Sequence, residues 1–173
     1  MLDLGCGTGR HTVFLAGQGF RVFGFDWSEA SIARTRAELS KGGLDANLAV
    51  WDMTSTPYPY PDSHFDAVFA VRVIQHALAD SISKAALEIA RVTRKGGRLY
   101  LEVPTPARLA RQKREGVPFR KCEAGTWIPL GGDEKGVPHH FFKRGELASL
   151  FSGFTSVEID EQAEHFILTA TRA

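Results

Sequence analysis

Short apolar runs alternate with longer amphipathic stretches along this chain. Runs at about residues 1–5, 20–26, 46–51, 65–71 and 98–103 have the composition of strands, and most of the stretches between them have helical apolar spacing. Strands that alternate with helical crossovers favour a mostly parallel sheet with helices on both faces. The pattern therefore predicts an α/β, doubly wound fold.

The clearest predicted helix covers DSISKAALEIARVTRKGG, residues 80–97. Asp80 stands where an N-terminal cap is expected, and Lys95 followed by two glycines is typical of a helix C-terminus. Apolar or small residues recur on one face of this helix, namely Ile82, Ala85, Ala86, Ile89 and Thr93. The preceding stretch MTSTPYPYPDSH contains three prolines, so we expect an irregular loop there.

Residues 104–142 interrupt the alternation with many glycine, proline and basic residues. We expect this stretch to be a lid or substrate loop inside a single domain that covers residues 1–173. A short helix is expected in KRGELASLFS. The last two predicted strands, TSVEID and EHFILTATR, are joined by so few residues that they must pair antiparallel.

The charge balance, the cysteine spacing and the length of the apolar runs exclude several classes of function. In 173 residues, 21 Lys and Arg nearly balance 20 Asp and Glu, so no global charge indicates nucleic acid or an anionic membrane as partner. The two cysteines, Cys6 and Cys122, do not have the spacing of a zinc site or a disulfide framework. No apolar run approaches the roughly 20 residues that span a bilayer. We therefore expect a cytoplasmic protein without a metal site.

The stretch DLGCGTGR places Gly5, Gly7 and Gly9 between a strand and a helix. Glycines allow a sharp turn and close ligand approach, and a helix N-terminus offers free N–H groups. Asp26 ends the second strand, where its carboxylate would lie beside this loop and accept hydrogen bonds from both hydroxyls of a ribose. Trp27 follows, either to flank an adenine ring or to pack against the fold.

The glycine spacing distinguishes between nucleotide ligands. Dinucleotide sites use G-x-G-x-x-G, whereas here the third glycine comes one residue earlier and Asp3 lies two residues before Gly5. A pyrophosphate would be repelled by this acid, and a ligand with an ammonium and a sulfonium would be favoured. A nicotinamide-dependent oxidoreductase is therefore the weaker enzyme alternative.

Five blocks, DLGCGTGRH, GFD, WDM, FDAVFAVRVIQHA and RVTRKGGRLYLEVP, resemble in order and spacing the class I S-adenosylmethionine-dependent methyltransferases. The resemblance covers nearly the whole chain and is strongest to the small type 11 and type 25 methyltransferases, including the tellurite-resistance-like group. It implies a seven-stranded Rossmann-like sheet of order 3-2-1-4-5-7-6, with the last strand antiparallel. It also implies S-adenosylmethionine as cofactor and S-adenosylhomocysteine as product.

Position by position, the resemblance implies a set of cofactor-binding residues. Asp3 and the backbone of Gly5, Cys6 and Gly7 would hold the methionine part. The remaining contacts would come from Asp26 at the ribose, Trp27, Asp52 and Met53 at the adenine, and Ala70 and Val71 at the amino-acid end. Cys6 is expected there for its size and not for thiol reactivity.

Three histidines are the candidate catalytic bases, should the methyl acceptor arrive protonated: His76, His139 and His140. Adjacent strand residues point to opposite faces, so at most one of His139 and His140 can face the site, and we expect no metal bound by this pair. Arg72 would meet a carboxylate or remain exposed. We expect a solvated face, with attraction of an anionic substrate or RNA as the alternative, at the basic residues Arg108, Arg111, Lys113, Arg114, Arg120 and Lys121.

These observations predict transfer of a methyl group from S-adenosylmethionine to N, O, S or a metalloid in a small-molecule acceptor. The alternative is a catalytically impaired or truncated S-adenosylmethionine-binding protein, because relatives usually carry one or two helices before the first strand. Without such helices one sheet face would be uncovered, and we expect it to favour a homodimer. We expect neither nucleic acid nor membrane as partner.

Overall fold

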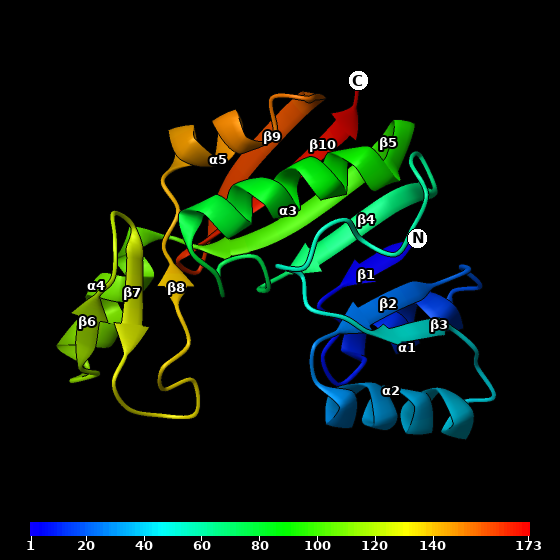
Figure 1. The fold of residues 1–173 in the computed structure, drawn as a ribbon, viewed down its shortest axis with the longest axis horizontal. Helices are drawn as coiled ribbons and strands as arrows, with labels where there is room; N and C mark the ends of the chain where they lie inside the picture. Colours follow the sequence, from blue (N-terminus) through cyan, green and yellow to red (C-terminus); the bar gives the residue numbers. More distant parts are fainter.

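The computed structural model describes residues 1–173 as a seven-stranded sheet with helices on both faces and a small three-stranded sheet at one end (Figure 1). The large sheet has the order β3-β2-β1-β4-β5-β10-β9. Its parallel part consists of β1 (Leu2–Leu4), β2 (Phe23–Asp26), β3 (Asn47–Val50), β4 (Phe65–Val71) and β5 (Thr93–Pro104). This arrangement confirms the predicted fold class and strand order.

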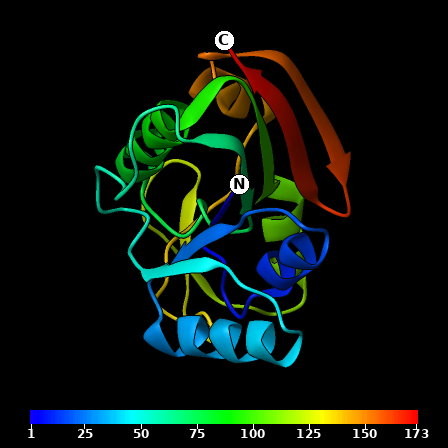
Figure 2. The same ribbon diagram turned by 90° about the vertical axis from the view of Figure 1, so that its right-hand side faces the viewer.

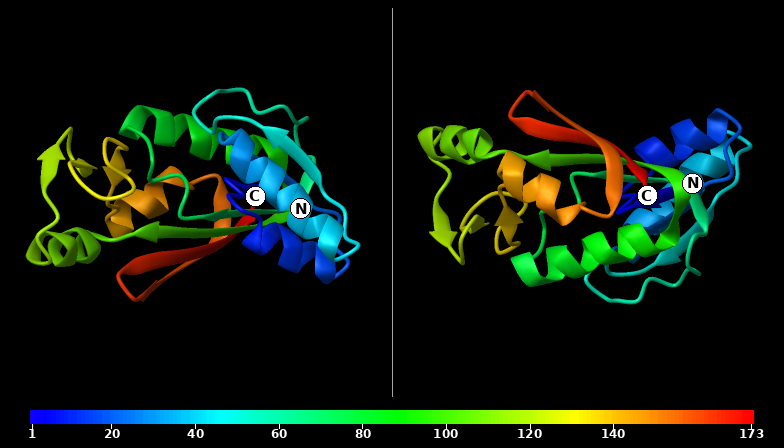
Figure 3. Two further views of the ribbon diagram at one scale, coloured as in Figure 1. Left: turned by 90° about the horizontal axis from the view of Figure 1, so that it is seen from below. Right: turned by 90° about the horizontal axis from the view of Figure 1, so that it is seen from above.

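The sheet ends in an antiparallel hairpin, β9 (Phe154–Gln162) and β10 (His165–Arg172). Strand β10 also runs antiparallel to β5, which confirms the predicted direction of the last strand. The hairpin and helix α2 (Glu29–Lys41) lie at opposite edges of the sheet (Figure 2). Between them, α3 (Ala79–Val92) and α5 (Arg144–Leu150) cover one face, and α1 (Arg10–Gly17) lies on the other (Figure 3).

The start of α3 differs from the prediction. The residue before its first turn is Leu78, and no side chain of the helix caps it. Instead, the Ala79 N–H donates to Glu123 at 2.7 Å, a carboxylate from a distant part of the chain. Asp80 lies inside the first turn and pairs with Lys84 one turn later, at 2.7 Å. The predicted Asp80 cap is therefore wrong, because a tertiary contact supplies the acceptor.

The end of α3 also differs, since the helix stops at Val92 and not at the glycines. Thr93 already belongs to β5, where it pairs with Phe65 of β4. The Thr93 hydroxyl donates back to the Ile89 carbonyl at 2.6 Å, and the residue is buried. Pairing in the sheet thus overrides the helical spacing that placed Thr93 on the helix face.

Residues 105–142, here called the lobe, contain more structure than the predicted loop. They form α4 (Pro106–Arg114), β6 (Phe119–Lys121), β7 (Thr126–Pro129) and β8 (His139–His140). The three strands pair antiparallel in the order β6-β7-β8. The sequence pattern did not predict these elements, because prolines and glycines are compatible with regular structure where they lie at a helix start or at turns.

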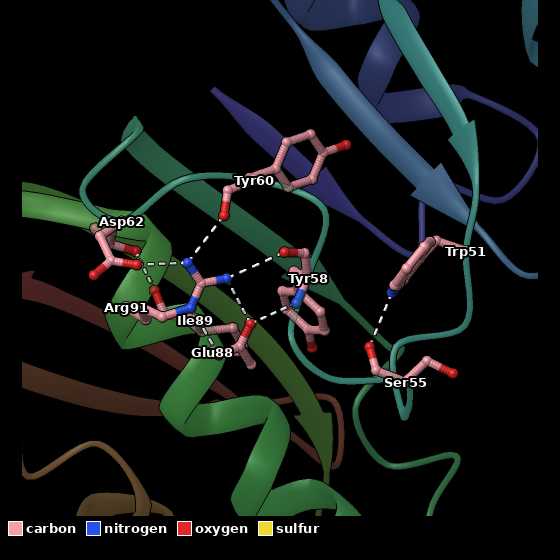
Figure 4. Close-up of polar contacts among 9 residues, drawn as sticks. Trp51, Ser55, Tyr58, Tyr60, Asp62, Glu88, Ile89 and Arg91 are labelled. Atoms are coloured by element: carbon pink, nitrogen blue, oxygen red, sulfur yellow. Dashed lines mark hydrogen bonds and ion pairs between the residues drawn. The ribbon is translucent and has the colours of Figure 1, made fainter.

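The proline-rich stretch before β4 is irregular, as predicted, and Arg91 of α3 fixes it (Figure 4). The Arg91 guanidinium donates to the carbonyls of Tyr58 and Tyr60 at 3.2 and 2.9 Å and pairs with Asp62 and Glu88, both at 2.7 Å. Glu88 in turn accepts from the Tyr58 N–H at 2.6 Å. This network holds the loop that follows β3 in place without regular backbone pairing.

The sheet face opposite α3 is partly open between α1 and the hairpin. Phe69, Tyr100 and Ile167 point to this face and are half-buried, and the rings of Phe69 and Tyr100 stack with centroids 5.5 Å apart. The opposite face carries the main core, including Leu101 and Leu168, under α3 and α5. Among all helices of the structure, none combines the length and apolar character that crossing a membrane requires.

Candidate functional site

A cavity of about 560 Å³, here called the main pocket, lies at the carboxyl ends of the parallel strands. Ligands of doubly wound sheets bind at this edge, near the point where the strand order reverses. Six of the residues predicted to bind a cofactor line it: Gly5, Gly7, Asp26, Trp27, Asp52 and Met53.

Gly5 and Gly7, the first two glycines of the loop after β1, have different structural roles. A Cβ on Gly5, whose φ is +66°, would come within 2.1 Å of the Val73 side chain, so this glycine allows the segment after β4 to pack against the loop. A Cβ on Gly7 would meet nothing within 4 Å, so glycine is not required there for space. Its φ of +53° is the backbone conformation that favours glycine. Because Gly7 also lines the main pocket, the space beside it is available to a ligand.

Asp26 connects the end of β2 with the glycine loop. Its two carboxylate oxygens accept from the Gly7 N–H and the Ser28 N–H, each at 2.9 Å, and the residue is only 9% exposed. A carboxylate has about four lone-pair positions, so two remain after these bonds. Asp26 is thus fixed at the pocket wall with acceptor capacity left for hydroxyl groups.

Asp3 lies behind the glycine loop and does not line the main pocket. Its side chain is buried and accepts from the Thr12 hydroxyl at 2.6 Å. Burial raises the pKa of Asp3 from 3.8 to about 6, against the Thr12 hydrogen bonds that lower it. The Asp3 carboxyl therefore has no direct contact with the main pocket.

Four other predicted residues also lie outside the pocket lining: Cys6, Gly9, Ala70 and Val71. The Cys6 N–H is already bonded to the Phe25 carbonyl at 2.9 Å. Burial raises the pKa of the Cys6 thiol to about 12, which fits the expectation that this cysteine is present for size. Gly9 forms the N-cap of α1.

An aromatic rim closes the other side of the main pocket. Trp27 is 77% exposed, and Trp51, which the sequence analysis did not single out, lines the pocket from the end of β3. The Trp51 indole N–H donates to the Ser55 carbonyl at 2.9 Å, which fixes its plane (Figure 4). Asp52 accepts from both the backbone N–H and the hydroxyl of Thr54, each at 2.8 Å.

Two of the three candidate catalytic histidines meet next to the main pocket. The rings of His76 and His139 have centroids 4.7 Å apart, at an interplanar angle of 72°. Glu134, from the loop between β7 and β8, lies 3.0 Å from His139 Nε2 and 3.6 Å from His76 Nε2. Burial, together with the charge of the neighbouring His139, lowers the pKa of His76 to about 4.

These three residues separate the main pocket from a smaller cavity of about 180 Å³, here called the side pocket. His76 and Glu134 line both cavities, and so does Arg72. The Arg72 guanidinium pairs with Glu102 at 2.5 Å, so it is held at the border between the cavities. A ligand in the main pocket and a second ligand in the side pocket would therefore meet at this border.

His140 points away from both cavities. It is 2% exposed, and its ring nitrogens lie 2.7 Å from the Thr126 hydroxyl and 2.7 Å from Glu146. Only one member of the adjacent pair thus faces the site, as the strand alternation indicates. Glu134 was missed by the sequence analysis, because no local spacing connects a loop glutamate with a histidine that precedes α3.

Comparisons with known proteins agree with this geometry. Residues 2–101, more than half of the chain, match the profile of a family described as a methyltransferase domain. The fold and the pocket define a Rossmann-like domain that binds a nucleoside-containing ligand. The chain belongs to the class I S-adenosylmethionine-dependent methyltransferase family, which confirms the resemblance noted above.

Curated relatives match about 60% of the chain. The chain is 33% identical over 114 residues to 27-O-demethylrifamycin SV methyltransferase of Amycolatopsis mediterranei, covering 63% of this chain and 41% of that protein. It is 34% identical over 103 residues to demethylmenaquinone methyltransferase of Tropheryma whipplei, covering 58% and 40%. The chain spans less than half the length of these relatives.

Solved structures match over 99% of this chain. An S-adenosylmethionine-dependent methyltransferase from Methanosarcina mazei superimposes with a TM-score of 0.81 at 23% identity and is covered to 91%. The 1,6-didemethyltoxoflavin-N1-methyltransferase of Burkholderia thailandensis, solved with its substrate and S-adenosylhomocysteine, gives a TM-score of 0.72 at 19% identity and 70% coverage. At these identities the likeness establishes the fold.

Proposed function

We propose that the main pocket binds S-adenosylmethionine and that the domain transfers its methyl group to a nucleophilic N, O, S or metalloid atom of a small-molecule acceptor. The observation that carries the proposal is the Asp26 carboxylate, held by the Gly7 amide at the rim of a pocket that Gly7 leaves open. The family match supports the same cofactor.

The residues of the main pocket fit the parts of this cofactor. Asp26 would accept from the ribose hydroxyls, and Trp27, Asp52 and Met53 would surround the adenine. The buried charge of Asp3 behind the loop would favour the ammonium end. When bound, the cofactor supplies an electrophilic methyl group on a sulfonium, and this chain's residues orient the acceptor and exclude water.

The acceptor would lie at the border of the main and side pockets, beside His76 and His139. Their Nε2 atoms can orient an acceptor or take up its proton, and Arg72 and Glu134 are the charged groups beside them. The side pocket of about 180 Å³ suits a small molecule or one functional group of a larger one. His140 takes no part in this proposal, because it faces away from both cavities.

Calorimetric titration with S-adenosylmethionine, S-adenosylhomocysteine and NADPH tests the proposal. We expect saturable binding of the first two ligands, no binding of NADPH, and affinity at least about tenfold weaker in Asp26→Asn, since charged hydrogen bonds are among the stronger ones. Asp45→Asn, an exposed acid far from the pocket, is the matched control. Binding of NADPH alone would overturn the proposal.

Turnover separates the enzyme from the alternative of an impaired binding protein. A panel of small hydroxyl, thiol and amine acceptors, with S-adenosylhomocysteine release as readout, should show product with at least one class. Binding of the cofactor with no turnover across the panel would favour the alternative.

We also propose that the half-open sheet face around Phe69 and Tyr100 pairs with a second copy of this chain. The stacked, half-buried aromatic rings of this face support the proposal. Light scattering after size exclusion should give a dimer mass that Tyr100→Glu reduces to that of a monomer.

A further inference from the structure

The contacts around His139 determine where its lone pair lies. His139 Nδ1 is 2.9 Å from the Val137 carbonyl oxygen, which can only accept, so Nδ1 carries the hydrogen. In the neutral ring, Nε2 then presents its lone pair to Glu134 Oε2 at 3.0 Å. An imidazole nitrogen and a carboxylate oxygen thus face each other, and either a proton on the imidazole or a bound cation can join them.

His76 repeats this arrangement from the opposite side. Its Nε2 lies 3.3 Å from the Gln75 amide nitrogen, which can only donate, and 3.6 Å from Glu134 Oε1. The ring therefore also offers its Nε2 lone pair. The amide oxygen of Gln75, a residue that is 4% exposed and lines the side pocket, has no hydrogen-bond partner.

We propose that His76, Glu134 and His139 bind one divalent transition-metal ion, with Zn²⁺ as the best match to two imidazoles and one carboxylate. The one ligand atom offered by each residue lies within 4.8 Å of the other two. Bonds of about 2.1 Å to a common ion require these atoms to approach by about 1 Å. Glu134 can supply this movement, since its side chain is 59% exposed and comes from a loop.

Three protein ligands leave a fourth position open, as in catalytic zinc sites. Because His76 and Glu134 line both cavities, this position lies at their border, where the proposed function places the acceptor. The inference rests on that proposed function and narrows its acceptor class. The ion would take a hydroxyl or thiol of the acceptor in ionised form, and the proton would pass to solvent.

The site also explains why a metal was not expected from the sequence. His139 and His140 were considered as a pair, but their side chains point to opposite faces. The second imidazole comes from the segment that precedes α3, and the carboxylate comes from the loop before β8. Only the position of the lobe beside the ends of β4 and β5 brings the three together.

Metal binding by the full chain tests the inference directly. The protein is stripped with a chelator, dialysed and titrated with Zn²⁺ and with Co²⁺, whose visible absorption reports coordination by nitrogen and oxygen. We expect one equivalent of tightly bound ion and an affinity at least about tenfold lower in Glu134→Gln and in His139→Ala. His64→Ala, which removes an exposed imidazole outside both cavities, should bind as the wild type does.

Addition of 2-mercaptoethanol to the Co²⁺ form should shift its absorption, because a thiol can enter the open position. Glu134→Gln tests the site without a fold defect, since the exposed side chain leaves no cavity. The inference would be overturned if the wild type bound no stoichiometric metal, or if His64→Ala lost as much metal affinity as Glu134→Gln. The two histidines would then act as metal-free bases. Failure of S-adenosylmethionine to bind the wild type would overturn the proposed function instead, whatever the metal titration gives.

Discussion

The buried carboxyl of Asp3 lowers the stability of this protein at neutral pH. Burial raises the pKa of Asp3 to about 6, from 3.8 for the exposed group. Between these two pH values the folded protein holds a proton that the unfolded chain has released. The free energy of unfolding therefore falls as the pH rises through this window and stays lower above it.

The size of the effect follows from the difference between the two pKa values. About two pH units correspond to about 3 kcal/mol at neutral pH, at 1.36 kcal/mol per unit. Asp3→Asn keeps the shape and the acceptor for the Thr12 hydroxyl at 2.6 Å but removes the charge. We expect the variant to be more stable by about 1–3 kcal/mol at pH 7.5, since the buried amide N–H groups offset part of the gain.

Urea unfolding followed by tryptophan fluorescence measures this difference. The advantage of Asp3→Asn should be largest at pH 7.5 and should shrink at pH 4.5, where the wild-type carboxyl is mostly protonated in the folded state. Asp45→Asn should change stability little at either pH. A variant that is less stable than the wild type at pH 7.5, or a difference that does not depend on pH, would refute the reasoning.

Two further predictions concern stability and reactivity. Arg91→Met should lower the free energy of unfolding by about 2 kcal/mol, measured by urea unfolding, because the carbonyls of Tyr58 and Tyr60 lose their donor; an unchanged midpoint would contradict the role assigned to the network. Iodoacetamide at pH 8 should label the exposed Cys122 but not Cys6, whose thiol pKa is raised to about 12 by burial, and mass spectrometry of the labelled peptides would reveal a reactive Cys6 at once.

Much of the fold was predictable because its signals are local. The strand before the glycine loop, the Asp26 that ends β2 and the short link between β9 and β10 are each determined by a few adjacent residues. These residues fix the carboxyl edge of the sheet, where six of the predicted contacts line the main pocket. The boundaries of α3 were not predictable, since Glu123 and the pairing of Thr93 are contacts across the fold.

The strands of the lobe and the proposed metal-binding cluster were not predictable from the sequence for a related reason. Strand β8 has only two residues, too few for an alternation of apolar and polar residues to predict a strand. Glu134 lies in a loop without periodicity. It contacts His76 and His139 only because the lobe packs beside the ends of β4 and β5. The histidine pair was correctly predicted to divide between two faces, but the sequence could not say that His139 would meet His76.

The lobe begins and ends at one place on the sheet. Thr105 donates its N–H to the Glu164 carbonyl at 2.9 Å, and Phe142 donates to the Pro104 carbonyl at 3.0 Å, so the chain leaves β5 and returns beside it. A segment anchored in this way can be exchanged for another of different length while the strand ladder stays intact. Under the proposed function, a transplanted lobe would bring its own equivalents of Glu134 and His139 to the cofactor-binding sheet, and acceptor preference would be transferred with it.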